Sequence, residues 1–302
     1  MGGALSAICV GCTSRKHGPA NSFLSQAALA PGDQESVADA WAARLRSDLS
    51  DHRVPAGTLY AGQGLTRARN LVATFGGRLF VMSAGLGLVH DETAVPSYDL
   101  TIAKIPGAVT EKVQGAFSAS AWWDAMMEGP YAASLASLLE GRGRIVIALS
   151  QSYAAMVGPW LATLPAVARG RLRLLGARLD RDLPASLVAQ WIQYDSRLET
   201  AVPGMQLHYA TRAMEHFLSV CGRMPMTHVA ADQARVEAAM AGVVCPRPAV
   251  RPRMDDRDLA PMVAQAMARC GSMARALAYL RKVTGVACSD QRFRTLLREA
   301  RA

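Results

Sequence analysis

The sequence predicts an α/β fold, in which helices flank a central parallel or mixed β-sheet, followed by a small domain made only of helices. Short apolar runs without polar alternation, typical of strands buried on both faces, alternate with helical segments over residues 5–221. Three prolines then fall within residues 246–252, which indicates a linker. We therefore expect an α/β domain at 1–243, a linker at 244–258 and a three-helix domain at 259–302.

Apolar runs and their period place the individual elements. Strands are expected at 5–11, 58–60, 78–83, 144–149 and 172–176. Helices are expected at 33–49, from Thr66 onward, at 122–140 and at 207–221. In the last domain, Gly271 and Gly285 end the first two helices, and Ser272 and Ser289 cap the second and third, so that helices are expected at 259–269, 273–282 and 290–301.

The composition supports a folded chain. Of its 302 residues, 51% are hydrophobic and 19% charged, so a sizeable core can form and global disorder is excluded. No apolar run is long enough to span a membrane, and the N-terminus lacks the basic and apolar regions of a signal peptide. We expect a cytoplasmic protein that does not associate with membranes.

The cysteines give little sign of a metal site. All six are expected to be reduced thiols in the cytoplasm. Cys9 and Cys12 form the only close pair, without a second pair or histidines at ligand spacing. The pair fits a structural zinc site less well than a buried strand with Cys12 at its end, so no metal is expected, and no organic cofactor either.

The net charge of +9 is unevenly distributed. The segment 251–302 holds 11 Arg and Lys against 5 Asp and Glu, so it carries +6 of that charge. Its exposed basic residues are expected to be Arg275, Arg281, Lys282, Arg292, Arg294 and Arg298. Three short helices with a basic face are typical of a helix-turn-helix-type DNA-binding domain, although a small bundle with a solvated charged face has the same pattern.

Polar residues follow the expected strands, where ligands bind in sheets of this class. They fall at 12–16, Gln63, 83–91 and 150–153. The chain has no Walker loop, no GxGxxG after a strand, no HExxH and no GxSxG, which argues against nucleotide hydrolysis and dinucleotide redox chemistry. Carboxylates at Asp91 and Asp99 are the plausible chemical groups, since a carboxylate stabilises a cationic transition state. Asp91 fits a turn or helix cap equally well, whereas Asp99 is harder to explain as surface.

Several of these segments resemble a known family in their order. They are Ser83-Ala84-Gly85-Leu86-Gly87-Leu88-Val89, Tyr98-Asp99-Leu100-Thr101, Leu149-Ser150-Gln151-Ser152-Tyr153, and Pro203-Gly204 with Arg212. The chain resembles domains of unknown function related to the uracil-DNA glycosylase superfamily and to deazaguanine-modification proteins. It is also similar to phage-defence DNA glycosylases that excise bulky modified bases such as glucosylated hydroxymethylcytosine. The tail 271–293 is similar to a small helical domain often joined to such cores.

The resemblance implies a uracil-DNA-glycosylase-like fold and a DNA glycosylase that leaves abasic sites in modified phage DNA, without an obligate protein partner. The chain lacks the Gly-Gln-Asp-Pro-Tyr-His and His-Pro-Ser-Pro loops of uracil-DNA glycosylases, so we infer that Asp99 or Asp91 supplies the carboxylate. Substrate contacts are expected from Cys12, Ser14, Gln63, Ser83, Tyr98, Ser150, Gln151 and Tyr153, and DNA contacts from Lys16, Arg212 and the tail.

Two other functions stay open at this point. One is a protein that binds modified nucleic acid without cutting it, and the other is a base-exchanging transglycosylase with a carboxylate nucleophile. Tyr98 either stacks on a base or only packs in the core. Because Lys16 is the only lysine in the strand-end loops, Schiff-base lyase chemistry is disfavoured and a monofunctional enzyme is expected.

Overall fold

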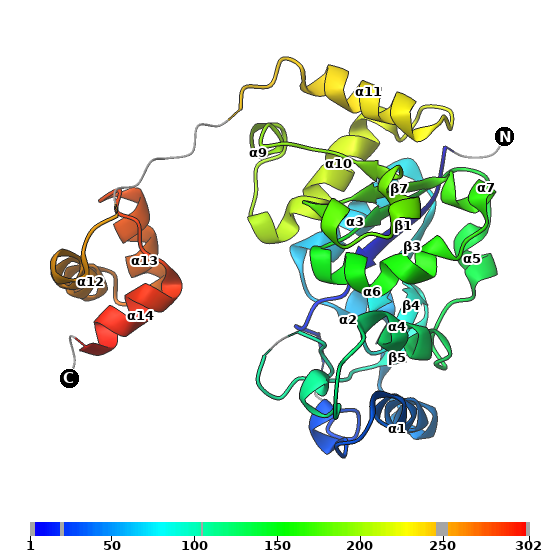
Figure 1. The fold of residues 1–302 in the computed structure, drawn as a ribbon, viewed down its shortest axis with the longest axis horizontal. Coiled ribbons are helices and arrows are strands. Elements are labelled where there is room, and N and C mark those ends of the chain that lie inside the picture. Colours follow the sequence, from blue (N-terminus) through cyan, green and yellow to red (C-terminus); the bar gives the residue numbers. More distant parts are fainter. Residues whose placement is uncertain (1–3, 19–20, 104, 246–252, 300–302) are drawn as a thin grey trace. The chain divides into compact units, whose positions relative to one another are not determined.

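The computed structural model describes residues 4–18, 21–103, 105–245 and 253–299. It divides into two compact units, Met1–Pro246 and Arg247–Ala302, each with its own hydrophobic core. The first unit is an α/β fold and the second is helical, which confirms the predicted fold class (Figure 1). Residues 246–252 of the expected linker, 244–258, lie outside the described residues.

The first unit is built on a six-stranded sheet with the strand order β4-β3-β1-β6-β7-β8. All neighbouring strands are parallel except β4, which pairs antiparallel to β3 at one edge. The strands are β1 (Leu5–Gly11), β3 (Arg78–Ser83), β4 (Gly87–His90), β6 (Arg144–Ala148), β7 (Leu172–Leu175) and β8 (Trp191–Ile192). Two further strands, β2 (Arg53–Pro55) and β5 (Ala94–Pro96), form a separate antiparallel pair.

Helices cover both faces of this sheet (Figure 1). Helix α3 packs on β1 and β3, and α10 packs on β6, β7 and α3, whereas α4 packs against α6, α1 and β4. The helices of this unit are α1 (Gln34–Ser47), α2 (Ala56–Leu59), α3 (Gln63–Phe75), α4 (Ala119–Met127), α5 (Leu135–Leu139), α6 (Gln151–Ala162), α7 (Ala166–Arg169), α8 (Ala185–Val188), α9 (Leu198–Ala201), α10 (Tyr209–Cys221) and α11 (Val229–Met240). Burial on both faces explains why the central strands are uniformly apolar.

Two predicted elements are wrong. The segment 58–60 was expected as a strand, but Ala56–Leu59 forms the short helix α2, and Tyr60 makes only an isolated bridge to Lys16. The single helix expected at 122–140 is two helices, α4 and α5. Gly129 and Pro130 stand between them, and a residue before proline is disfavoured in a helix.

The strand order places the topological switch point between β1 and β6. From β1 the chain builds outward to β3 and β4 on one side, and then returns to build β6, β7 and β8 on the other. At such a point the connections leave from opposite faces, and ligands bind at the adjoining carboxyl ends of the strands. Here those ends are Gly11 and Ala148.

A buried ion cluster ties α11 to the sheet, away from those carboxyl ends. The carboxylate of Asp232 accepts hydrogen bonds from Arg144 at the start of β6 (2.8 Å) and from Arg173 in β7 (2.7 Å). Arg235 and Thr227 also donate to it, at 2.8 and 3.0 Å. Arg144, Arg173 and Asp232 are all fully buried, so this part of the positive charge serves the fold.

The second unit contains α12 (Asp256–Cys270), α13 (Met273–Lys282) and α14 (Asp290–Glu299). Helix α12 begins within the expected linker, because Asp256 and Asp258 occupy its first turn, where acidic residues are favoured. Its core includes Leu259, Leu280 and Phe293, each fully buried. Across the described part of the chain, none of the helices combines the length and apolarity that crossing a bilayer requires.

Candidate functional site at the carboxyl end of β1

Tyr153 occupies the switch point between β1 and β6. Its hydroxyl lies 3.1 Å from the Sγ of Cys12, the first residue after β1. Ser150, which follows β6, caps α6 because its hydroxyl oxygen accepts the N–H of Tyr153. This bond holds the backbone of Tyr153 in the first turn of the helix. The ring rests on Gly11, where a Cβ would lie 2.9 Å from a ring carbon, so a larger residue there would displace the ring.

The loop after β1 is held against the segment that follows α2. The N–H of His17 donates to Leu59 (2.7 Å), and the N–H of Ala61 donates to Arg15 (3.0 Å). Lys16 therefore bridges Tyr60 through its backbone. This pairing holds the side chain of Lys16 with its Nζ 4.1 Å from the centre of the Tyr98 ring and 5.9 Å from that of Tyr60.

A chain of hydroxyl groups runs beneath Lys16. The hydroxyl of Tyr98 lies 2.6 Å from the Oγ of Ser83, at the end of β3, and 2.9 Å from the hydroxyl of Tyr60. Ser83 also accepts the N–H groups of Gly85 and Leu86, so this fully buried serine holds the turn between β3 and β4. Ser83 was predicted to bind substrate; its hydrogen bonds and burial instead make it part of the support for Tyr98.

The electrostatics of this cluster follow from burial. Burial raises the pKa values of Tyr60, Tyr98 and Tyr153, so all three are neutral phenols at neutral pH. Burial also lowers the pKa of Lys16, and the charges of Cys12 and Asp99 oppose that shift only in part. The cluster therefore joins neutral hydrogen-bonding groups to an amine that loses its proton more easily than an exposed lysine.

Asp99 lies at the rim of this cluster. Its backbone pairs with Leu24 and Gln26 on the chain that follows the β1 loop, and its Oδ2 lies 3.5 Å from the Oγ of Ser25. Its side chain is exposed, unlike that of the adjacent Tyr98, which is 3% exposed. The ring of Tyr98 is surrounded by Lys16, Trp41, Tyr60 and Gly85. It can stack on a base only if some of these neighbours move.

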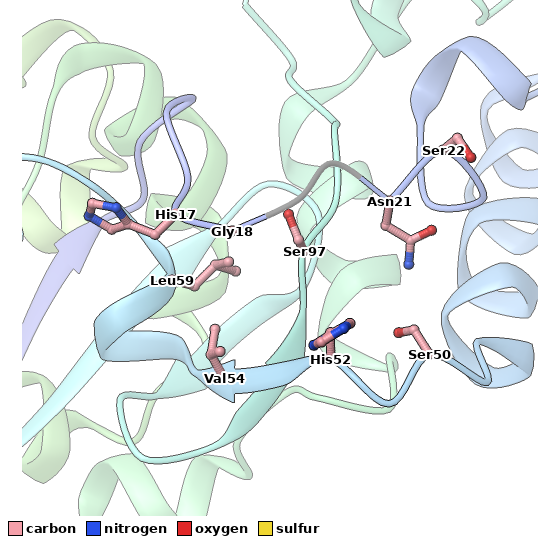
Figure 2. A pocket seen from close by; sticks show the side chains of 9 residues that line it. All are labelled: His17, Gly18, Asn21, Ser22, Ser50, His52, Val54, Leu59 and Ser97. Carbon is pink, nitrogen blue, oxygen red and sulfur yellow. The ribbon is translucent and has the colours of Figure 1, made fainter.

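A pocket of about 290 Å³ opens beside this loop. Figure 2 shows Asn21, Ser50 and His52 gathered at one end of it and His17 at the other. The lining residues are His17, Gly18, Asn21, Ser22, Ser50, His52, Val54, Leu59 and Ser97. Buried Asp48 orients two of them, since it accepts from Asn21 (3.1 Å) and Ser50 (2.6 Å). The volume lies just below the roughly 300–1,000 Å³ typical of small-molecule sites.

None of the eight predicted substrate residues lines this pocket. Ser14 is exposed on the β1 loop, and Ser150 and Gln151 begin α6 at the surface. Gln63 is the first residue of α3 and lines a separate groove of about 900 Å³ together with Arg15, Arg67 and Glu215. His17 lines both the pocket and this groove.

Asp91 does not lie at the carboxyl edge, where we expected it. Strand β4 runs antiparallel to β3, so Asp91, which follows β4, lies beside Leu79 at the start of β3. The N–H of Asp91 donates to the carbonyl of Leu79 at 3.0 Å. Its carbonyl accepts the N–H of Gly57. The error arose because the turn after Ser83 reverses the chain, which the apolar run 86–89 does not reveal.

The predicted DNA contact at Arg212 is also wrong. Its side chain is fully buried and donates to both carboxylate oxygens of Glu199, at 3.0 and 2.9 Å, and to the carbonyl of Val202 at 2.8 Å. Arg212 thus joins α10 to α9, and its unpartnered Nε is buried, so the side chain offers no group to a phosphate at the surface.

In the helical unit, the basic residues divide into two groups. Arg281 donates to Cys288 and Asp290, and Arg292 donates to Asp256 and Met254, so both hold the three helices together. The other predicted contacts, Arg275, Lys282, Arg294 and Arg298, are exposed. On α14, Arg294 and Arg298 share one face with exposed Gln291 and Thr295, opposite buried Phe293 and Leu296.

Comparisons with known proteins find no match, whether the chain is compared with family models, with curated proteins or with solved structures. Within the described ranges, no three His, Cys, Asp or Glu side chains group as a metal site would require. Sequence reasoning missed Tyr60, His52 and Asn21. The polar loop after the first strand indicated this region. The sequence did not indicate that residues 50–54 pack beside that loop and line the pocket.

Proposed function

We propose that the protein is a DNA glycosylase that hydrolyses the N-glycosidic bond of a modified base, with glucosylated hydroxymethylcytosine in phage DNA as the expected target. It would act in the cytoplasm as an antiviral defence and leave an abasic site. The target nucleotide is rotated out of the duplex into the pocket beside the β1 loop, as enzymes acting on bases require.

The observation that carries the proposal is the position of Asp99. It is an exposed carboxylate two residues after Ser97, which lines the pocket, and its charge acts on Lys16. Cleavage of a glycosidic bond passes through an oxocarbenium-like sugar, which a nearby carboxylate stabilises while it orients water. Asp99 is not itself among the pocket-lining residues, which suits a group that acts on the sugar and not on the base.

The pocket and the helical unit supply the remaining parts. The imidazoles of His17 and His52 and the amide of Asn21 offer hydrogen bonds to a base edge or its sugar adduct. The exposed arginines of α13 and α14 suit sequence-independent contacts with phosphates.

The test compares DNA containing glucosylated hydroxymethylcytosine with the same sequence containing plain cytosine. The full-length protein should release the modified base and create alkali-labile sites only in the former. Asp99→Asn should lower the rate by roughly 10²–10³, the usual loss when one electrostatic stabiliser is removed. Asp91→Asn is the matched control, because Asp91 lies at the opposite end of β3, and its rate should not change.

An absence of abasic sites on every modified DNA overturns the proposal, and so does an unchanged rate in Asp99→Asn. Stoichiometric binding of modified DNA without base release would instead identify a non-catalytic binding protein. Incorporation of a free labelled base into the DNA would identify a transglycosylase.

A further inference from the structure

We propose that the amine of Lys16 is a nucleophile that forms an imine with an aldehyde, the aldehyde being C1′ of the ring-opened deoxyribose at an abasic site. The substrate rests on the proposed function, whereas the chemistry rests on the surroundings of Lys16. The proposal departs from the monofunctional enzyme expected from the sequence.

The backbone around Lys16 is fixed on both sides. Arg15 and His17 each make a backbone hydrogen bond to the segment 59–61, and Thr13 donates its hydroxyl to Ala61 at 2.9 Å. The side chain consequently leaves the loop from a set position and reaches over Tyr98. Lysines used only for charge usually extend into solvent, but Lys16 is half-buried.

Burial also makes the amine of Lys16 easier to deprotonate than that of an exposed lysine, since it lowers the pKa. Only an unprotonated amine attacks a carbonyl, and desolvation is one of the ways by which proteins make lysine nucleophilic. Burial lowers the pKa of Lys16 here, more than Cys12 and Asp99 raise it. Arginine cannot lose its proton in this way. The chain uses lysine at only four of its 33 basic positions, so lysine is not its usual choice where charge alone is needed.

Lys16 is also next to the groups that the reaction needs. His17, the following residue, lines the base pocket, so the sugar of a flipped nucleotide would lie near this loop. Asp99 is the carboxylate whose charge acts on Lys16. An amine with a lowered pKa and an exposed carboxylate thus lie near one another, beside a pocket of about 290 Å³.

The reaction balances without an oxidant or a reductant. The lone pair of Nζ attacks C1′, the carbonyl oxygen takes up protons, and water leaves to give the protonated imine. Asp99 then removes a proton from C2′, a C2′–C3′ double bond forms, and the bond from C3′ to the phosphate oxygen breaks. The strand is cut on the 3′ side of the abasic site, and hydrolysis of the imine returns the amine.

The test uses duplex DNA with a preformed abasic site and sodium borohydride, which reduces an imine to a stable covalent bond. The full-length protein should give a covalent protein–DNA product. Lys16→Arg, which keeps the positive charge over Tyr98, should reduce this product at least about tenfold, because a guanidinium forms no imine. Lys112→Arg is the matched control, since Lys112 is another half-buried lysine of the same unit, and its yield should not change.

A preformed abasic site separates this test from the proposed function, because trapping does not require base release. Trapping that depends on Lys16 supports the inference even if no base is ever excised, in which case the proposed function alone fails. No trapping by the wild-type protein, or equal trapping by Lys16→Arg, overturns it. If Lys16→Arg does not fold, mass spectrometry of the wild-type adduct shows which amine is attached to the DNA. Attachment at Lys16 supports the inference, and attachment at any other amine overturns it.

Discussion

The hydroxyl of Tyr153 lies 3.1 Å from the Sγ of Cys12, and this contact closes the switch point of the sheet. The ring of Tyr153 rests on Gly11 as well, so a side chain fills the place between the ends of β1 and β6 where ligands commonly bind in such sheets. Lys16, Tyr98 and Asp99 lie instead on the β3 side of β1.

Tyr98→Phe should destabilise the first unit. The substitution removes the hydroxyl that bonds Ser83 and Tyr60, and it leaves a buried hydroxyl of Tyr60 without its partner. We expect the free energy of unfolding to fall by about 1–3 kcal/mol, the cost of an unsatisfied buried polar group. Denaturant unfolding measures the change. Ser83→Ala, which removes another member of this chain of hydroxyls, should lower the free energy of unfolding by a similar amount. Trp41 also packs on Tyr98 but is not part of the chain, so Trp41→Phe does not test it.

Asp232→Asn should be among the most destabilising single changes. Its carboxylate is the anion shared by buried Arg144 and Arg173 and by half-buried Arg235, and the loss of its charge leaves guanidinium groups uncompensated. Breaking a buried ion pair from one side costs about 3–5 kcal/mol. Thermal or denaturant unfolding provides the measurement, with exposed Asp180→Asn as a control that should stay within about 0.5 kcal/mol. A mild effect at Asp232 would contradict this role.

The same cluster should make stability depend on acid. Burial opposes ionisation of Asp232, but hydrogen bonds from Arg144 and Arg173 outweigh it and lower the pKa of Asp232 from 3.8 to about 2. A carboxyl whose pKa is lowered in the folded state stabilises the fold at pH values above its unfolded-state pKa of 3.8. That stability is lost as the pH falls from 3.8 toward about 2. The difference in stability between wild type and Asp232→Asn should therefore shrink over this range and be constant near neutral pH.

Replacing Arg294 and Arg298 together with alanine should weaken DNA binding. Both are exposed on the outer face of α14, so the helical unit should keep its fold. If each contacts one phosphate, the slope of log K against log salt concentration should fall by roughly 2, at about 0.9 per phosphate. Titration of labelled duplex at several salt concentrations measures it. Arg142→Ala, an exposed change in the first unit, should leave the slope as it is.

Ser97→Leu should separate the two proposed activities. The larger side chain enters the base pocket, so release of a bulky modified base should drop by about 10- to 100-fold. Borohydride trapping on abasic DNA should persist, because an abasic nucleotide has no base to place there. Loss of both activities together, with unchanged thermal stability, would indicate that the pocket binds the sugar or the backbone instead of the base.

Local sequence was a good guide where one residue type has one structural use. Gly271 and Gly285 adopt positive φ values of 69° and 71° and end or separate helices as expected. The apolar runs 79–82 and 145–148 lie in strands because no polar residue interrupts them. Arginine has several uses, so the sequence did not distinguish Arg212, buried against Glu199, from exposed Arg294.

By itself, the sequence determined the α/β class, the helical C-terminal unit and the region after the first strand as a candidate site, because local propensity and hydrophobic period are encoded by neighbouring residues. Tertiary structure alone decided that Asp91 and Asp99, eight residues apart, lie at different places relative to β3, and that Lys16 reaches over Tyr98. Such relationships depend on chain reversal and on pairing between distant segments, and no local pattern of residues specifies either.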